Sequence, residues 1–178
     1  YNTLDTIYML ARINGEEKTM KMIQALSKYL RLSLSKGREI VTVEDELENV
    51  KSYMEIQQIR NENLFRYEIE CAEELKTRWI LKLILQPIVE NALIHAFDNS
   101  GEGNVITVTC KKNKGHMKIS VYDNGRGFQY EGFDKLTGIG LNNIKDRLEL
   151  NFGTESEMQI YSVIGCLLYT SPSPRDCS

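Results

Sequence analysis

The sequence predicts an α+β fold in which an N-terminal helical hairpin precedes a separate layer of mixed strands and helices. Three observations support this prediction. Apolar residues recur at helical spacing over residues 4–34, they alternate with charged residues over residues 64–71, and glycine-rich turns separate later strands from helices. The chain of 178 residues is 42% hydrophobic and 26% charged, which is typical of a protein that buries a core.

The helical elements come first. Asn14 and Gly15 interrupt the helical spacing and predict a turn between two helices, the second of which ends near Leu34. Thr42 is followed by acidic residues, as is typical of a helix N-cap, and predicts a third helix that runs to about Arg60.

Strands and helices then alternate. The predicted elements are a half-buried strand at 64–71, a long helix at 82–97, strands at 105–111 and 117–122, a helix at 141–150 and a last strand at 158–163. Residues 166–178, CLLYTSPSPRDCS, change character abruptly, and their back-translation resembles a sequencing-library transposon adapter read in frame. We therefore expect an adapter-like or disordered tail outside the native fold, and an unpaired sheet edge after Gly165.

Composition excludes several classes of protein. The 25 acidic and 22 basic residues are spread along the chain, so no basic stripe indicates nucleic-acid binding. The longest apolar run, residues 79–85, is far shorter than the roughly 20 residues of a membrane span. The four cysteines form no CxxC pair, which argues against a zinc site or a disulfide framework and fits a reducing cytoplasm.

A first candidate motif, LQPIVENALIHAF, places Glu90, Asn91 and His95 away from an apolar stripe on the predicted long helix. Asn91 and His95 are four residues apart and are expected to share a face. An asparagine oxygen suits a Mg²⁺ ion that takes its other oxygens from water and phosphate. The alternatives are a capping amide for Asn91 and a side chain interacting with the helix dipole for His95.

A second motif, VYDNGRGF, places Asp123 at the end of a buried strand. Its carboxylate only accepts hydrogen bonds, which suits the exocyclic amino group of adenine. Gly125 and Gly127 would let the backbone approach a flat base closely. The alternative is a tight turn between two strands.

A third motif, TGIGLNNIKDRL, places Gly138 and Gly140 before a helix whose first-turn amides can hold phosphate oxygens. Residues 128–137, between the two glycine pairs, have the length of a lid over a bound nucleotide. A glycine pair, a short lid and a second glycine pair before a helix, in this order, indicate a nucleotide-binding site more specifically than either glycine pair alone.

Taken in order, LQPIVENA, DNGRGF and GIGLNNIKDRLELNFG resemble the N box and the two glycine boxes of the GHKL ATPase superfamily, which includes gyrase, Hsp90, MutL and the histidine kinases. Within it, the chain resembles sensor histidine kinases of the LytS and YesM type. Their phosphoacceptor signature reads PHFLYNTLDTI, and this chain begins YNTLDTI. The resemblance therefore places the acceptor histidine three residues before Tyr1.

The resemblance implies a Bergerat-type α/β sandwich over residues 37–165, preceded by a truncated dimerisation and phosphoacceptor region over residues 1–36. It implies that Asn91 binds Mg²⁺, that Asp123 binds adenine, and that Glu90 is a candidate for polarising the acceptor imidazole, or else for orienting the metal ligand. The other nucleotide-binding residues that it implies are His95, Gly125, Gly127, Gly138, Gly140, Leu141, Asn143 and Arg147.

The expected function follows from the resemblance. The parent protein would bind Mg-ATP and transfer the γ-phosphoryl group to a histidine outside this sequence, then to a response regulator. The parent would be a homodimer in the bacterial inner membrane. This chain would be its cytoplasmic domain, joined to the membrane only through upstream segments. This chain, without the histidine, is not expected to phosphorylate itself. Ile94, where many relatives carry lysine, keeps open a degenerate nucleotide sensor, and a serine kinase or ATPase on the same fold is the other alternative.

Overall fold

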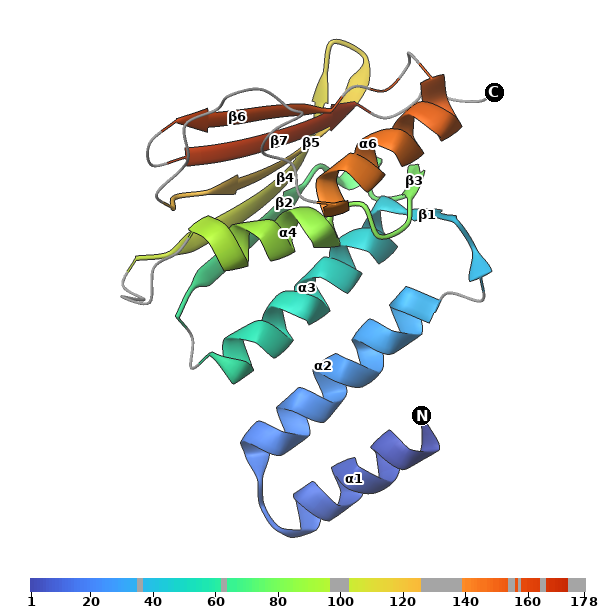
Figure 1. Cartoon of the computed structure of the whole chain (residues 1–178). Coiled ribbons are helices and arrows are strands. Elements are labelled where there is room, and N and C mark those ends of the chain that lie inside the picture. Colours follow the sequence, from blue (N-terminus) through green and yellow to red (C-terminus); the bar gives the residue numbers. More distant parts are fainter. Residues whose placement is uncertain are drawn as a thin grey trace.

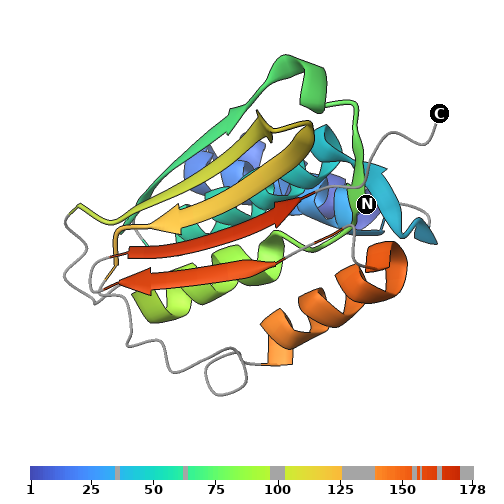
Figure 2. The same ribbon diagram turned by 90° about the horizontal axis from the view of Figure 1, so that it is seen from above.

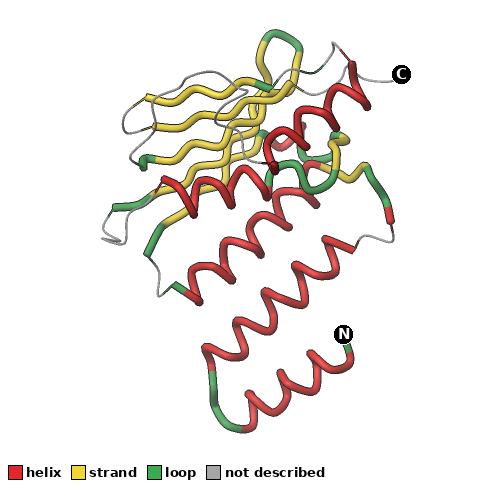
Figure 3. Tube along the Cα trace, viewed as in Figure 1, coloured by secondary structure: helices red, strands yellow, loops and turns green. Residues whose placement is uncertain are grey.

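The computed structural model describes residues 1–34, 37–61, 64–96, 103–125, 139–153, 156, 158–163 and 166–172. One layer of helices packs against one face of a sheet (Figures 1 and 3). The N-terminal helical hairpin lies on the far side of this layer, further from the sheet. Figure 2 looks onto the opposite face of the sheet, over which no described helix lies. No helix in the described part of the chain is long and apolar enough to cross a bilayer.

The predicted hairpin and third helix are confirmed. Helix α1 covers Asn2–Ile13 and α2 covers Glu17–Leu34, with Gly15 at a φ of 70° in the turn between them. Helix α3 covers Val43–Arg60. The Thr42 hydroxyl accepts a hydrogen bond of 3.1 Å from the Asp45 amide, so the predicted N-cap is confirmed as well.

Five strands form the main sheet in the order β2-β4-β5-β7-β6. Their bounds are Arg66–Cys71 for β2, Val105–Asn113 for β4, His116–Asp123 for β5, Gln159–Val163 for β6 and Cys166–Pro172 for β7. Strand β2 runs parallel to β4, because a crossover that includes a helix connects them, and the other neighbours are antiparallel. The strands predicted at 64–71, 105–111, 117–122 and 158–163 are thus confirmed with small changes at their ends.

Strand β7 contradicts the expected unpaired edge after Gly165. It lies between β5 and β6 and pairs antiparallel with both, from Asp123↔Leu167 on one side and Val163↔Cys166 on the other. Ladder hydrogen bonds are made by the backbone, and a Leu-Leu-Tyr-Thr sequence favours extended structure, so this segment can complete the sheet. The adapter origin of its sequence stays a prediction.

The helix predicted at 82–97 starts later than expected and changes type along its length, although helical structure does reach Ala96. Trp79–Leu81 forms strand β3, which pairs with β1 at Ile40–Thr42. Helix α4 covers only Gln86–Asn91, with a proline in its first turn, and Ala92–Ala96 continues it as a π-helical turn, η3. Leu83 has a φ of 56°, which breaks the helical path before α4.

The main core lies between the sheet and the helices α3, α4 and α6, the last of which covers Ile139–Phe152. The apolar stripe predicted on the N-box segment is fully part of it: Leu81, Ile84, Leu85, Ile88 and Ala92 are all buried. The buried residues of α1 and α2 in the described structure, namely Ala11, Ile23 and Ala25, lie outside this cluster. The hairpin therefore adds little to the main core.

Candidate nucleotide-binding site

Asp123 is the strongest candidate for binding a ligand. It ends β5, its side chain is 1% exposed, and its Oδ1 accepts a hydrogen bond of 3.0 Å from the Gly125 amide. The other oxygen, Oδ2, is buried and has no hydrogen-bond partner among the described residues. Burial raises the pKa of this carboxyl group to about 6, although the Gly125 N–H lowers it in part. A buried acceptor without a partner is costly, so a ligand that donates a hydrogen bond fits here.

Asn124 holds this strand end in place. Its Oδ1 accepts from the Val105 amide at 2.7 Å, and its Nδ2 donates to the Gly103 carbonyl at 2.6 Å. The end of β5 is thereby tied to the start of β4. The motif VYDNGRGF alone does not predict this role, because the two partners of Asn124 lie 19 and 21 residues away in the sequence.

Glu90 and Asn91 lie at the C-terminal end of α4, and both side chains are half-buried. Glu90 Oε1 accepts a hydrogen bond of 2.7 Å from Gln86 Nε2, one helical turn earlier. Glu90 and the predicted magnesium ligand Asn91 are thus the last two residues of a short helix.

The π-helical turn η3 changes the spacing on which the predicted shared face of Asn91 and His95 depended. Asn91 and His95 were expected to share a face because α-helical spacing repeats every 3.6 residues. Over Ala92–Ala96 the hydrogen bonds instead join residues five apart, and such turns are frequent at functional sites. The side chain of His95 lies outside the described structure. Ile94, in the same turn, is 68% exposed.

Helix α6 begins directly against α4. A Cβ atom built on Gly140 would lie 3.6 Å from Pro87 Cβ, so the first turns of the two helices are in contact. Leu141 is buried in the core and Asn143 is exposed. Gly127, Gly138 and the predicted lid at 128–137 lie outside the described residues.

Arg147 contacts the backbone that precedes α4. Its guanidinium donates to the Lys82 carbonyl at 2.7 Å and to the Leu83 carbonyl at 3.4 Å. These bonds hold the N-box segment in position. A contact between Arg147 and a nucleotide stays a prediction.

Glu46 holds the same segment from the other side, and sequence analysis missed it. Its carboxylate accepts hydrogen bonds from the amides of Leu83, Ile84 and Leu85 at 2.8, 2.9 and 3.0 Å. Burial raises the pKa of Glu46, while these amides and the charge of Arg147 lower it in part. Three backbone bonds explain how a carboxylate that is 1% exposed is accommodated in the core.

The described residues contain no group of three or more His, Cys, Asp or Glu side chains that could hold a metal ion. A Mg²⁺ ion bound through Asn91 would therefore take most of its oxygens from phosphates and water, as this ion commonly does.

Two family models match the chain. The first, described as "Histidine kinase", covers residues 1–65, and the second, "Histidine kinase-, DNA gyrase B-, and HSP90-like ATPase", covers residues 80–170. The sensor histidine kinase YesM of Bacillus subtilis is 37% identical over 91% of this chain and 28% of its own length. The sensor protein LytS of Staphylococcus saprophyticus is 34% identical over 91% of this chain and 29% of its own length. The chain thus spans less than a third of these relatives.

Several solved histidine kinases have a similar fold. The histidine kinase domain of the Erythrobacter litoralis EL346 blue-light activated kinase has a TM-score of 0.58 at 16% identity, covering 97% of this chain and 82% of that one. A catalytic domain of the histidine kinase ThkA has a TM-score of 0.59 at 17% identity, covering 76% of this chain and 95% of that one. With the sequence relatives and the second family model, these findings show that the chain belongs to the histidine kinase-, DNA gyrase B- and HSP90-like ATPases and is homologous to the sensor histidine kinases among them.

Proposed function

We propose that this chain is the Mg-ATP-binding catalytic core of a sensor histidine kinase and that the longer protein transfers the γ-phosphoryl group of ATP to a histidine upstream of Tyr1. The observation that carries the proposal is Asp123, whose buried Oδ2 lacks a partner in the described structure. The exocyclic amino group of adenine is a donor that would satisfy this oxygen. The family match over residues 80–170 supports a nucleotide as the ligand.

The residues present fit this ligand in their chemistry. Asn91 would hold Mg²⁺, which neutralises phosphate charge when bound. The first-turn amides of α6 would hold phosphate oxygens, since α6 begins against α4. Glu90 would accept a hydrogen bond from the acceptor imidazole and so orient it for attack on the γ-phosphorus. The bond between that phosphorus and the bridging oxygen would then break and release ADP.

The partners follow from the same proposal. A homodimer would form through the helices of residues 1–34, and a response regulator would take the phosphoryl group onto an aspartate. A solved structure of ThkA in complex with the response regulator TrrA has a TM-score of 0.57 at 16% identity, covering 90% of this chain and 51% of that one, which supports a partner of this class. In the parent protein this domain would lie in the cytoplasm, and segments upstream of it would attach the protein to the inner membrane.

Binding of Mg-ATP to the 178-residue chain, measured by calorimetry, tests the nucleotide site. Asp123→Ala should abolish binding, whereas the exposed Asp5→Asn on α1 should leave it unchanged. Circular dichroism of each variant would establish that it is folded. A folded parent chain that binds no Mg-ATP would contradict the proposal.

Phosphoryl transfer requires the longer protein with its upstream histidine. Incubation with ATP labelled on the γ-phosphate should give a label that is stable in base and lost in acid, as expected for phosphohistidine. Binding without any label would favour a degenerate sensor, and a label that is stable in acid would favour a serine kinase.

A further inference from the structure

A chain of polar contacts joins the N-terminal hairpin to Glu90. Gln86 Nε2 donates to Glu90 Oε1 at 2.7 Å and lies 2.9 Å from the Tyr29 hydroxyl on α2. Gln86 Oε1 lies 3.2 Å from the same hydroxyl and 3.5 Å from Asn49 Nδ2 on α3. Asn49 Oδ1 in turn accepts from Ser33, also on α2, at 3.0 Å. We call these five residues the Gln86 junction.

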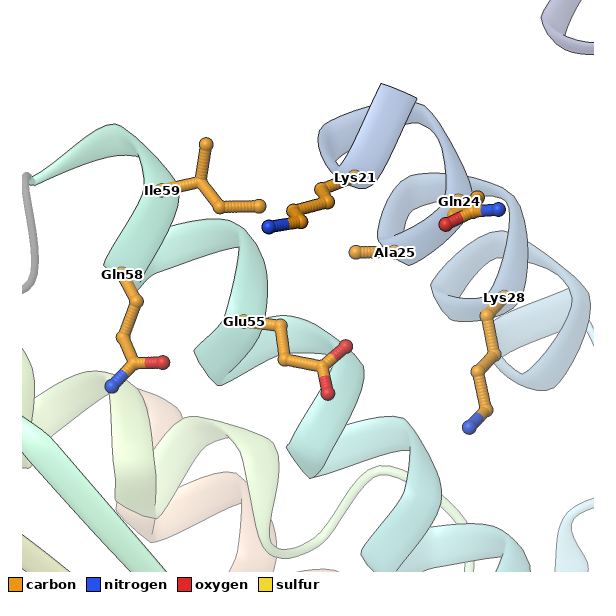
Figure 4. A pocket seen from close by; sticks show the side chains of 7 residues that line it. All are labelled: Lys21, Gln24, Ala25, Lys28, Glu55, Gln58 and Ile59. Carbon is orange, nitrogen blue, oxygen red and sulfur yellow. The ribbon is translucent and has the colours of Figure 1, made fainter. Parts of the chain in front are cut away.

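The junction lies where α2 meets the rest of the molecule. Toward its N-terminal end, α2 is separated from α3 by an open cleft of about 380 Å³ (Figure 4). The lining residues are Lys21, Gln24, Ala25, Lys28, Glu55, Gln58 and Ile59. Toward its C-terminal end, α2 approaches α3 and α4 at Tyr29 and Ser33, and the Tyr29 ring lies 6.2 Å from that of Tyr53. The buried residues of the hairpin lie outside the main core, and the junction adds polar contacts to the packing of α2 against α3.

Gln86 is suited to transmit the position of α2. Its amide nitrogen carries two N–H donors, so it can bond to the Tyr29 hydroxyl and the Glu90 carboxylate at the same time. Its contacts are part-buried, where a hydrogen bond is stronger than in water. Movement of Tyr29 would therefore change the orientation of the Gln86 amide, and with it the hydrogen bond that holds the Glu90 side chain.

We propose that Tyr29 and Gln86 are positioning residues for Glu90, through which the position of α2 sets the rate of phosphoryl transfer without changing the affinity for ATP. The inference rests on the proposed function, in which Glu90 contacts the acceptor histidine. It goes beyond that function because it assigns a role to Tyr29 of α2 and Gln86 of α4, which the proposed function does not use to bind the nucleotide or the histidine.

The test uses the longer protein that carries the acceptor histidine. Tyr29→Phe removes the hydroxyl and keeps the ring, while Gln86→Leu removes the side-chain amide, both its N–H₂ and its carbonyl oxygen. Each should lower kcat for histidine labelling about tenfold, the effect expected of one lost hydrogen bond that orients a reacting group. The KM for ATP and its Kd by calorimetry should stay unchanged. Tyr8→Phe is the matched control, because the Tyr8 hydroxyl bonds only with Gln24 on α2 among the hydrogen bonds described, at 3.2 Å.

The same substitutions in a Glu90→Gln background separate positioning from a general loss of structure. If Tyr29 and Gln86 act through Glu90, Tyr29→Phe should lower kcat much less in that background than alone. An equal loss in both backgrounds, an unchanged kcat in the single variants, or a raised KM for ATP would overturn the inference. A parent protein that binds ATP and labels no histidine would instead overturn the proposed function, and the inference with it.

Discussion

At the residue scale, the buried carboxylate of Asp123 lowers the stability of the folded protein near neutral pH. Burial raises its pKa from 3.8 to about 6, so the folded state binds a proton more tightly than the unfolded state does. The unfolded chain therefore loses its proton first as pH rises. Stability falls between about pH 4 and pH 6 and stays reduced above that range, by roughly 3 kcal/mol at most. A nucleotide that bonds to the charged carboxylate would offset this cost.

Asp123→Asn should separate stability from function. The amide keeps an acceptor for the Gly125 N–H and removes the buried charge, so the free energy of unfolding at pH 7 should rise by about 1 to 3 kcal/mol. The gain should shrink as pH falls through 6 toward 4, because the folded state then takes up the proton that neutralises the buried carboxylate. Affinity for ATP should fall at least tenfold, since the amide N–H₂ would meet the amino group of adenine.

Urea unfolding followed by circular dichroism between pH 4 and pH 7, together with calorimetry of ATP binding, checks both effects. Asp5→Asn is the control, because Asp5 is exposed and should change neither quantity. A lower stability of Asp123→Asn at pH 7 would contradict the account of a costly buried carboxylate.

Sequence reasoning reached Asp123 because its signal is local: a strand, an aspartate and a glycine-rich turn are consecutive. It missed Glu46 and Gln86 because their partners are distant in sequence. Glu46 binds amides 37 to 39 residues away, and Gln86 reaches Tyr29 across 57 residues. No periodicity of apolar residues marks such pairs, since they depend on how α2, α3 and α4 pack.

At the element scale, the N-box segment shows where periodicity misleads. The predicted apolar stripe is buried as expected, yet the helix begins at Gln86 rather than at 82. The Glu46 carboxylate accepts hydrogen bonds from the amides of Leu83 to Leu85, and the Arg147 guanidinium donates to the carbonyls of Lys82 and Leu83. These backbone groups therefore have hydrogen-bond partners without forming a helix. The pattern identified which residues face the core, but the side chains of α3 and α6 decide the backbone path.

The β4–β5 hairpin offers a prediction at this scale. Its strands pair up to Asn113↔His116, which leaves a two-residue turn of Lys114 and Gly115 with φ values of 49° and 87°. Two positive φ values are typical of a type I′ turn, in which asparagine before glycine is preferred. Lys114→Asn should therefore raise the free energy of unfolding by about 0.5 to 1 kcal/mol.

Thermal or urea unfolding measures this change. Lys112→Asn, an exposed substitution within β4, is the matched control and should be neutral or slightly destabilising, because asparagine is disfavoured in strands. If Lys114→Asn gave no gain over this control, the turn would not have the strained conformation described.

At the scale of the whole molecule, the fold combines two parts of unequal packing. The sheet and helices α3, α4 and α6 share one core, while α2 packs against α3 outside that core and adds the polar contacts of the Gln86 junction and an exposed ion pair between Lys28 and Glu48. Exposed ion pairs contribute little stability. The hairpin should therefore move more readily than the sheet, which suits an element that would transmit a signal to Glu90.

The sheet depends on strand β7, which lies between β5 and β6 and is the only neighbour of β6 among the described strands. A chain that ends at residue 165 would lose both ladders, leaving β5 with an open edge and β6 without a partner. We expect its midpoint of thermal unfolding to fall by about 10 °C or more, with light scattering from aggregates, since each kcal/mol corresponds to roughly 2 to 4 °C for a domain of this size. A chain that ends at residue 172 keeps β7 and should unfold like the 178-residue chain. If the chain ending at 165 were equally stable, strand β7 would contribute nothing, and the sequence-based expectation of a tail outside the native fold would stand.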